Sequence, residues 1–261
     1  PPLPITYVGK IWRSNCSIFG KDKHNPKKRK EQRLMFYIVI FIAIAIASYM
    51  VQANLQRKFK RYSQVAVSAG LTGREVAEKM LRDHGITDVQ VISTPGQLTD
   101  HYNPTTHTVN LSEGVYESCS VAAAAVAAHE CGHAVQHQHA YAPLRLRSSL
   151  VPVVQVASRW TPWLLLGGIL TLTIFPQILL AGIILFALTT LFSFVTLPVE
   201  IDASRRAIAW LQGAGITSAA QQPMATDALR SAAYTYVVAA LSSLATLIYY
   251  VLIFMGGSRD E

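Results

Sequence analysis

Three long stretches of this chain contain no charged side chain, and they limit the folds available to it. Leu34–Gln56 holds 23 residues without Asp, Glu, Lys or Arg, Trp160–Val199 holds 40, and Ser231–Ser258 holds 28. A helix that crosses a bilayer needs about 20 consecutive apolar residues. The middle stretch is long enough for two crossings, with a turn at Pro176-Gln177. We therefore expect a mainly α-helical integral membrane protein with about four transmembrane helices, rather than a soluble protein with long core helices.

These stretches divide the chain into six parts. We expect a basic tail (1–34), a first transmembrane helix (35–56) and a soluble domain (57–159). A transmembrane hairpin (160–199), a cytosolic segment (200–230) and a last transmembrane helix (231–258) should follow. The tail holds nine Lys and Arg against two Asp and Glu, so +7 of the chain's net charge of +8 belongs to it. We expect it to be disordered, or to lie upstream of the natural start. Binding to anionic lipid or nucleic acid is the alternative, but with so few aromatic residues no nucleic-acid partner is expected.

Basic residues beside the apolar stretches predict the orientation. Arg57–Arg61 carries four Lys and Arg directly after the first span, which marks the cytosolic side under the positive-inside rule. The turn inside the hairpin has no charge, whereas Arg205 and Arg206 follow the third span. We expect the soluble domain and residues 200–230 on the cytosolic side and both termini outside. The basic tail, where native, opposes this placement of the N-terminus.

The soluble domain, inserted between the first and second spans, has room for one small α+β fold. Thr72–Glu75 has the spacing of a capping box, and the helix that it opens is expected to end at Gly85. Residues 89–93 and 106–111 alternate as short strands do. The segment 100–104, which contains Asn and Pro, is expected to connect them.

The sequence His129-Glu130-Cys131-Gly132-His133 is an H-E-x-x-H motif. Four residues along a helix advance about one turn, so both imidazoles would face one way and could bind a single Zn²⁺. Glu130 would then reach the metal-bound water and act as its base. The surrounding segment is rich in Ala and has no other charge from Val121 to His139. A helix with incidental histidines is the alternative.

A catalytic zinc ion takes a third protein ligand and leaves one position open. His137 lies about 12 Å along the helix from His129, too far to share the ion, so we expect it to border the site. Glu200 is the predicted third ligand, because a carboxylate directly after 40 uncharged residues is costly unless it is used. The even number of crossings after the motif returns the chain to the same side. Asp202 is a rival ligand, and pairing of Glu200 with Arg205 or Arg206, without a metal, is the alternative.

The motif residues and their surroundings resemble the YugP-like neutral zinc metallopeptidases, which are bacterial membrane proteins. The resemblance runs from Met35 to the C-terminus and is carried by residues 71–73, 100–102, 111–116, 129–137 and 197–200. The segment Glu200–Ser204 is also similar to the E-x-x-A-D box of the HtpX-like membrane proteases. In those gluzincins the first Glu binds zinc and the final Asp orients a ligand histidine. Ser204 stands at that Asp position here.

The resemblance implies a zinc-dependent endopeptidase of the bacterial plasma membrane, multi-pass, with its active site facing the cytosol and a peptide or protein as substrate. Its role would be the quality control of membrane proteins. The predicted zinc ligands are His129, His133 and Glu200, and the predicted general base is Glu130. His101 and Tyr102 are candidates for binding the oxyanion or the substrate. Ser204 and His137 are candidates for holding a zinc ligand in place.

Two other functions remain open. A site-2-type intramembrane protease also carries H-E-x-x-H, but within a transmembrane span, and only eight apolar residues precede His129 here. A non-proteolytic zinc-binding membrane protein would close the fourth position with another Cys or His. The three Cys have no disulfide pattern, which suits a reducing cytosol. Small residues in the spans are compatible with an oligomer as well as with a monomer.

Overall fold

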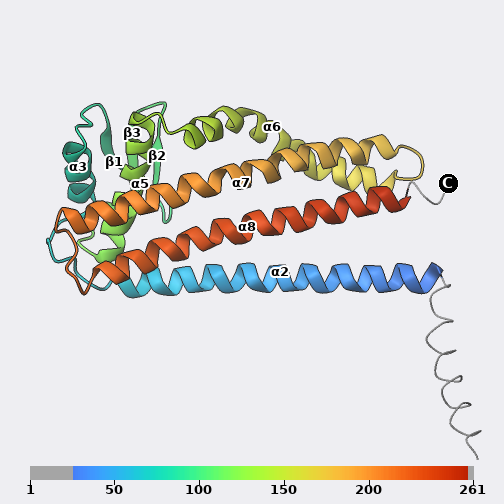
Figure 1. The fold of residues 1–261 in the computed structure, drawn as a ribbon, viewed down its shortest axis with the longest axis horizontal. Helices are drawn as coiled ribbons and strands as arrows, with labels where there is room; N and C mark the ends of the chain where they lie inside the picture. Colours follow the sequence, from blue (N-terminus) through green and yellow to red (C-terminus); the bar gives the residue numbers. More distant parts are fainter. Residues whose placement is uncertain (1–25, 258–261) are drawn as a thin grey trace, which may run out of the picture. The chain divides into compact units, whose positions relative to one another are not determined.

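The structure is a computed structural model that describes residues 26–257 (Figure 1). It divides into two compact units, residues 1–46 and 47–261. The predicted tail lies outside the described residues up to residue 25. Helix α2 (Pro26–Tyr62) begins earlier than the predicted boundary at residue 35. The segment 26–34 is helical rather than disordered, because its Lys, Arg, Glu and Gln are good helix formers and Pro suits a first turn.

Three described helices are long and apolar enough to cross a membrane: α2, α7 (Pro176–Gly213) and α8 (Gln222–Gly257). A fourth was expected from the first half of the hairpin. Helix α6 (Ala142–Leu170) occupies that place, but it does not meet the same criterion. Its sequence is interrupted by Arg159 and by two prolines inside the helix. The count of four spans therefore stays a prediction.

Helices α6 and α7 form the expected hairpin (Figure 1). The turn occupies residues 171–175, and Pro176 begins α7 instead of lying in the turn. Proline fits that position because the first helical N–H has no partner inside the helix. A Cβ added to Gly168 would lie 2.4 Å from the Cα of Leu179, so a glycine is needed for the two backbones to approach.

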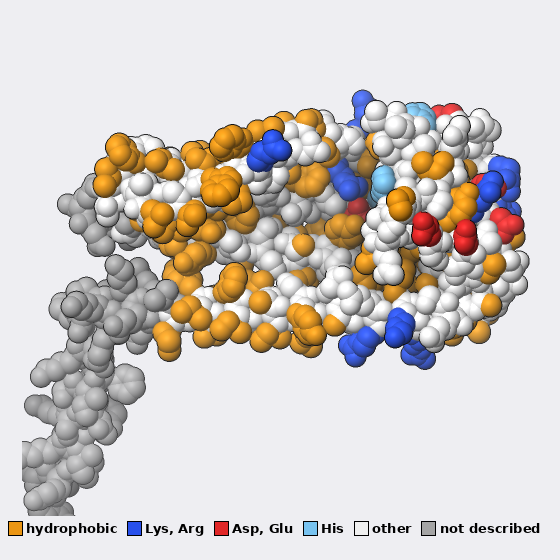
Figure 2. Space-filling view, turned by 180° about the vertical axis from the view of Figure 1, so that it is seen from behind, with side chains coloured by type: hydrophobic (Ala, Val, Ile, Leu, Met, Phe, Trp, Pro, Cys, Tyr) orange, Lys and Arg blue, Asp and Glu red, His pale blue; other side chains and the backbone are white. Residues whose placement is uncertain are grey.

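Apolar side chains cover the outside of this hairpin, and charged side chains gather over the soluble domain (Figure 2). The exposed large apolar residues of α6 include Val153, Val156, Trp160, Trp163 and Leu170. Such a continuous apolar surface is expected to face lipid rather than water.

The soluble domain combines a small sheet with short helices. Its three strands have the order β1-β3-β2, with β3 parallel to β1 and antiparallel to β2. The domain consists of α3 (Gly73–Asp83), β1 (Gln90–Thr94), β2 (His101–Asn103), β3 (Thr108–Ser112), α4 (Glu113–Tyr116) and α5 (Val121–Gln138).

The local predictions for this domain are largely confirmed. Thr72 caps α3 in a full capping box with Glu75, and Gly85 has a φ of 69° just after the helix ends. Two strands lie within two residues of their expected positions. The segment 100–104 is not simply a connection, since it contains strand β2. Local sequence hides this strand because it is short and exists only through its pairing with β3.

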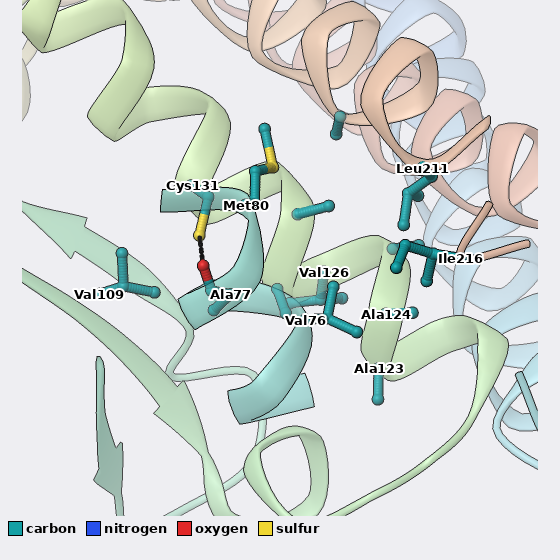
Figure 3. Packing of buried hydrophobic residues seen from close by; sticks show 14 of the residues in the cluster. Val76, Ala77, Met80, Val109, Ala123, Ala124, Val126, Cys131, Leu211 and Ile216 are labelled. Carbon is teal, nitrogen blue, oxygen red and sulfur yellow. Dashed lines mark hydrogen bonds between the residues drawn. The ribbon is translucent and has the colours of Figure 1, made fainter. Parts of the chain in front are cut away.

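The core of the domain lies around α5. Side chains from α3 and β3 pack on α5 together with Leu211 at the end of α7 and with Ile216 (Figure 3). The alanines of α5 are small enough for neighbouring elements to approach it on several sides. The ends of the long helices are therefore part of the soluble domain's core, which fixes α5 against α7.

Candidate metal centre

Helix α5 presents the motif residues from the core of the domain. Its first turn is capped by Ser120, whose side chain accepts a hydrogen bond from the N–H of Ala123. The ring centroids of His129 and His133 lie 4.9 Å apart, with their planes at 80°. Glu130 and His133 are buried. The two imidazoles therefore share one face of a firmly packed helix.

Helix α7 crosses α5 at very short range. A Cβ added to Gly132, between the two histidines, would lie 2.7 Å from the carbonyl oxygen of Ala203. Any other residue at this position would push the helices apart. The close crossing brings Glu200, one turn earlier on α7, over the imidazole pair.

Glu200 completes a three-residue cluster with the two histidines. Its Oε2 lies 3.3 Å from His129 Nε2 and 3.7 Å from His133 Nε2. Ligand atoms at about 2.0–2.2 Å from a tetrahedral zinc ion are roughly 3.3–3.5 Å apart. Among the described residues, this trio forms a group that could hold a metal ion. Two imidazole nitrogens, one carboxylate oxygen and an open side fit a catalytic zinc site.

The electrostatics of the cluster favour a cation. Burial disfavours the charged imidazolium of His133, but the carboxylates of Glu200 and Glu130 outweigh it and raise the pKa of His133 above its ordinary value. Glu200 itself is buried, and a buried carboxylate needs positive charge or hydrogen-bond donors close by. A metal ion would supply that charge.

Gln136 determines which nitrogen of His133 faces the cluster. Its Nε2 donates to the carbonyl of Val199 and to Asp202 Oδ2, at 2.8 Å each. Both partners accept, so the amide's Oε1 must be the atom 3.0 Å from His133 Nδ1. His133 then carries its proton on Nδ1, and its Nε2 lone pair is free for a metal. Gln136 was not predicted from the sequence. A glutamine three residues after a proposed ligand lies on the same face of the helix, so the spacing alone could have indicated this contact.

Ser204 lies beside the other histidine. Its Oγ is 3.1 Å from His129 Nδ1, the nitrogen directed away from the cluster. This is the place that the E-x-x-A-D resemblance assigns to an aspartate. The contact is present here with a neutral hydroxyl instead of a carboxylate.

Arg147 of α6 contacts the remaining oxygen of Glu200. Its Nη1 lies 3.2 Å from Oε1, which leaves Oε2 directed at the imidazoles. Arg205 and Arg206 were the expected partners of Glu200 in the alternative prediction, but Arg206 instead pairs with Asp202 at 2.6 Å. The contribution of Arg147 depends on how α6 folds back on α7, so local sequence does not signal it.

Glu130 is held by the edge strand of the sheet. The backbone N–H of Tyr102 donates to its Oε2 at 3.0 Å. The side chains predicted for the oxyanion make other contacts: Tyr102 Oη lies 3.0 Å from His137 Nδ1, and His101 Nδ1 lies 2.7 Å from the carbonyl of Thr99. His137 is exposed near the end of α5, apart from the metal-binding group.

A cavity of about 170 Å³ opens beside the cluster. The cavity wall includes His129, Glu130, Glu200 and Ser204, and also Tyr236 of α8. The remainder of the wall is mainly apolar. Tyr236 lies in the last apolar stretch, where sequence reasoning expected a transmembrane helix and no site residue.

Known proteins resemble this chain over most of its length. Residues 37–255 match the model of a family described as "Putative neutral zinc metallopeptidase". The chain belongs to this family. The "Putative membrane protease YugP" of Bacillus subtilis (strain 168) is 43% identical over 227 residues, which are 87% of this chain and 100% of that relative. No solved structure matches the chain. The family resemblance expected from the motif residues is thus confirmed.

Proposed function

We propose that this protein is a membrane-bound zinc endopeptidase in which His129, His133 and Glu200 hold Zn²⁺ and Glu130 is the general base. The observation that carries the proposal is the convergence of these ligand atoms from α5 and α7 beside a cavity that Glu130 also lines. When bound, zinc would polarise the scissile carbonyl and make water a competent nucleophile near neutral pH.

Glu130 moves the proton in this mechanism. The N–H of Tyr102 holds its Oε2, so the carboxylate keeps one orientation. Its Oε1 takes a proton from the attacking water and passes it to the nitrogen of the leaving amine. Burial of Glu130 limits competing contacts with bulk water.

The negative charge that develops on the substrate carbonyl needs a hydrogen-bond donor. We assign this role to Tyr236, because it lines the same cavity as Glu130 and Ser204 and carries a hydroxyl donor. His101 and Tyr102 remain the earlier candidates, and Tyr102 contributes through its backbone as well. Arg147 and Gln136 act as positioning residues for Glu200 and His133.

The placement of the site supports an active site at the cytosolic surface of the bacterial plasma membrane. Residues 176–199 of α7 span about 36 Å, slightly more than the bilayer's hydrocarbon core. Glu200 then lies just beyond the bilayer. The basic segment 57–61 lies on the same side under the positive-inside rule. Such a site suits cleavage of membrane-protein loops or misfolded chains, which is the basis for a role in quality control.

Two features favour this function over the alternatives. Helix α5 packs on the sheet and is not among the candidate membrane spans, unlike the motif helix of an intramembrane protease. The cluster has three ligand side chains among the described residues and borders a cavity, whereas a structural zinc site is closed by a fourth ligand.

Casein hydrolysis by a Glu130→Gln variant tests the proposal. The amide keeps the size of the side chain but cannot accept the proton, so we expect turnover to fall by about 10²–10⁴-fold. Glu117→Gln, at an exposed position outside the cavity, is the matched control and should retain full activity. Full turnover by Glu130→Gln would refute the assigned mechanism.

A further inference from the structure

The wall of the cavity beside the metal cluster is mostly apolar. Leu229, Ala232 and Ala233 line it from α8, and Leu55 and Phe59 line it from the end of α2. The two alanines are only partly buried, so their small side chains leave open space. A larger residue at either position would fill part of this space.

Leu98 lines the same cavity from the loop that precedes β2. It is 67% exposed and has a φ of 58°, a left-handed conformation that is rare for a leucine. An exposed apolar side chain on a strained backbone persists only when its surroundings fix it, and such residues are common at ligand sites.

The ends of this loop are fastened on both sides of Leu98. Thr99 Oγ1 lies 3.2 Å from Thr94 Oγ1 at the end of β1. Asp100 accepts hydrogen bonds from the backbone N–H and the hydroxyl of Ser112, at 2.7 and 3.0 Å. These contacts hold the residues that follow Leu98, which itself lines the cavity.

The acidic side chains in the cavity wall are Glu130, Glu200 and Asp100. Glu200 pairs with Arg147 and is a proposed zinc ligand, and Glu130 accepts a hydrogen bond from the N–H of Tyr102. A substrate carboxylate close to Asp100 would be repelled by it, because Asp100 has no basic partner among the residues that line the cavity. A basic side chain could approach Asp100, but its charge would lose hydration against the apolar remainder of the wall.

We propose that this cavity is a specificity subsite that takes one large apolar side chain, such as Leu or Phe, next to the scissile bond. The proposal rests on the proposed peptidase function and names its substrate class: extended segments with apolar residues at the cleavage point. Burying such a side chain against Leu98 and Leu229 would supply the selectivity, on the order of tenfold or more over a polar residue.

The test uses the full-length zinc-loaded protein in detergent with fluorogenic peptides that differ only in one residue flanking the cleaved bond. Peptides with Leu or Phe should be cleaved at least tenfold more efficiently, in kcat/KM, than those with Asp or Lys. Ala232→Phe should remove most of this preference by filling the cavity. Ala239→Phe, at an exposed position on α8, is the matched control and should keep the preference.

Equal cleavage of all peptides would overturn the subsite but leave the peptidase function intact, and a preference for Lys would instead assign specificity to Asp100. Absence of any hydrolysis by the wild type would contradict the proposed function itself. In that event, the subsite is tested by binding of the same peptides to zinc-loaded Glu130→Gln, measured by fluorescence anisotropy. The Leu peptide should bind at least tenfold more tightly than the Asp peptide, and equal affinities would refute the subsite.

Discussion

Neutral side chains contact the two histidines of the candidate metal cluster at the ring nitrogens directed away from its centre. Gln136 fixes the proton of His133 on Nδ1 by accepting through Oε1, and Ser204 lies against Nδ1 of His129. Groups that contact a ligand from behind commonly change metal affinity by about 10–100-fold when they are removed. These two residues are therefore part of the site, although neither would touch the metal.

We expect Gln136→Ala to weaken zinc binding by about 10–100-fold, because His133 loses the acceptor that selects its tautomer. Competition with a chromophoric chelator measures the affinity. Gln138→Ala, two residues further along α5 and exposed, should bind zinc as the wild type does. Equal affinity of the two variants would show that Gln136 has no part in ligand orientation.

Cys131, inside the motif, should be chemically inert. Burial raises the pKa of its thiol well above the ordinary value, with Glu130 adding to the effect, so little thiolate forms near neutral pH. In native protein, iodoacetamide should modify the exposed Cys119 and leave Cys131 unmodified, as read by mass spectrometry of digests. Rapid alkylation of Cys131 without unfolding would contradict this burial.

At the scale of helices, the crossing of α5 and α7 sets the position of Glu200. We expect Gly132→Ala to separate the two helices, because the new Cβ would lie 2.7 Å from the Ala203 carbonyl oxygen. The cost is about 1–3 kcal/mol of stability, with a loss of zinc affinity. Gly213→Ala near the end of α7 adds a Cβ that meets no atom within 4 Å, so it should preserve both properties. Thermal unfolding and chelator competition measure them.

Patterns confined to one element predicted that element well. The capping box of α3 and the H-E-x-x-H spacing are local patterns. Glu200 was singled out because it is a charge directly after 40 uncharged residues. Strand β2, Arg147 and Tyr236 were not predicted, since each acquires its role from packing against elements distant in the chain. The first half of the hairpin was predicted to cross the membrane. Arg159 and two prolines interrupt α6, so the predicted number of four transmembrane helices stays a prediction.

At the scale of the whole molecule, the account requires the soluble domain to lie in the cytosol. The exposed Cys119 reports this directly. In a Cys16→Ser background, a membrane-impermeant maleimide should label Cys119 only after bacterial cells are permeabilised. Labelling of intact cells would place the domain, and with it the metal cluster, on the outer side.

The central proposal is that α5 of the soluble domain and α7 of the hairpin bind one zinc ion together. Zinc content per chain, measured on purified wild type and on Glu200→Ala, tests it most directly. Glu113→Ala, an exposed position on α4, serves as the control. We expect one zinc per chain in the wild type and the control, and its loss from Glu200→Ala. Full zinc content in Glu200→Ala would contradict the proposed ligand set, because the third ligand would then have to come from elsewhere.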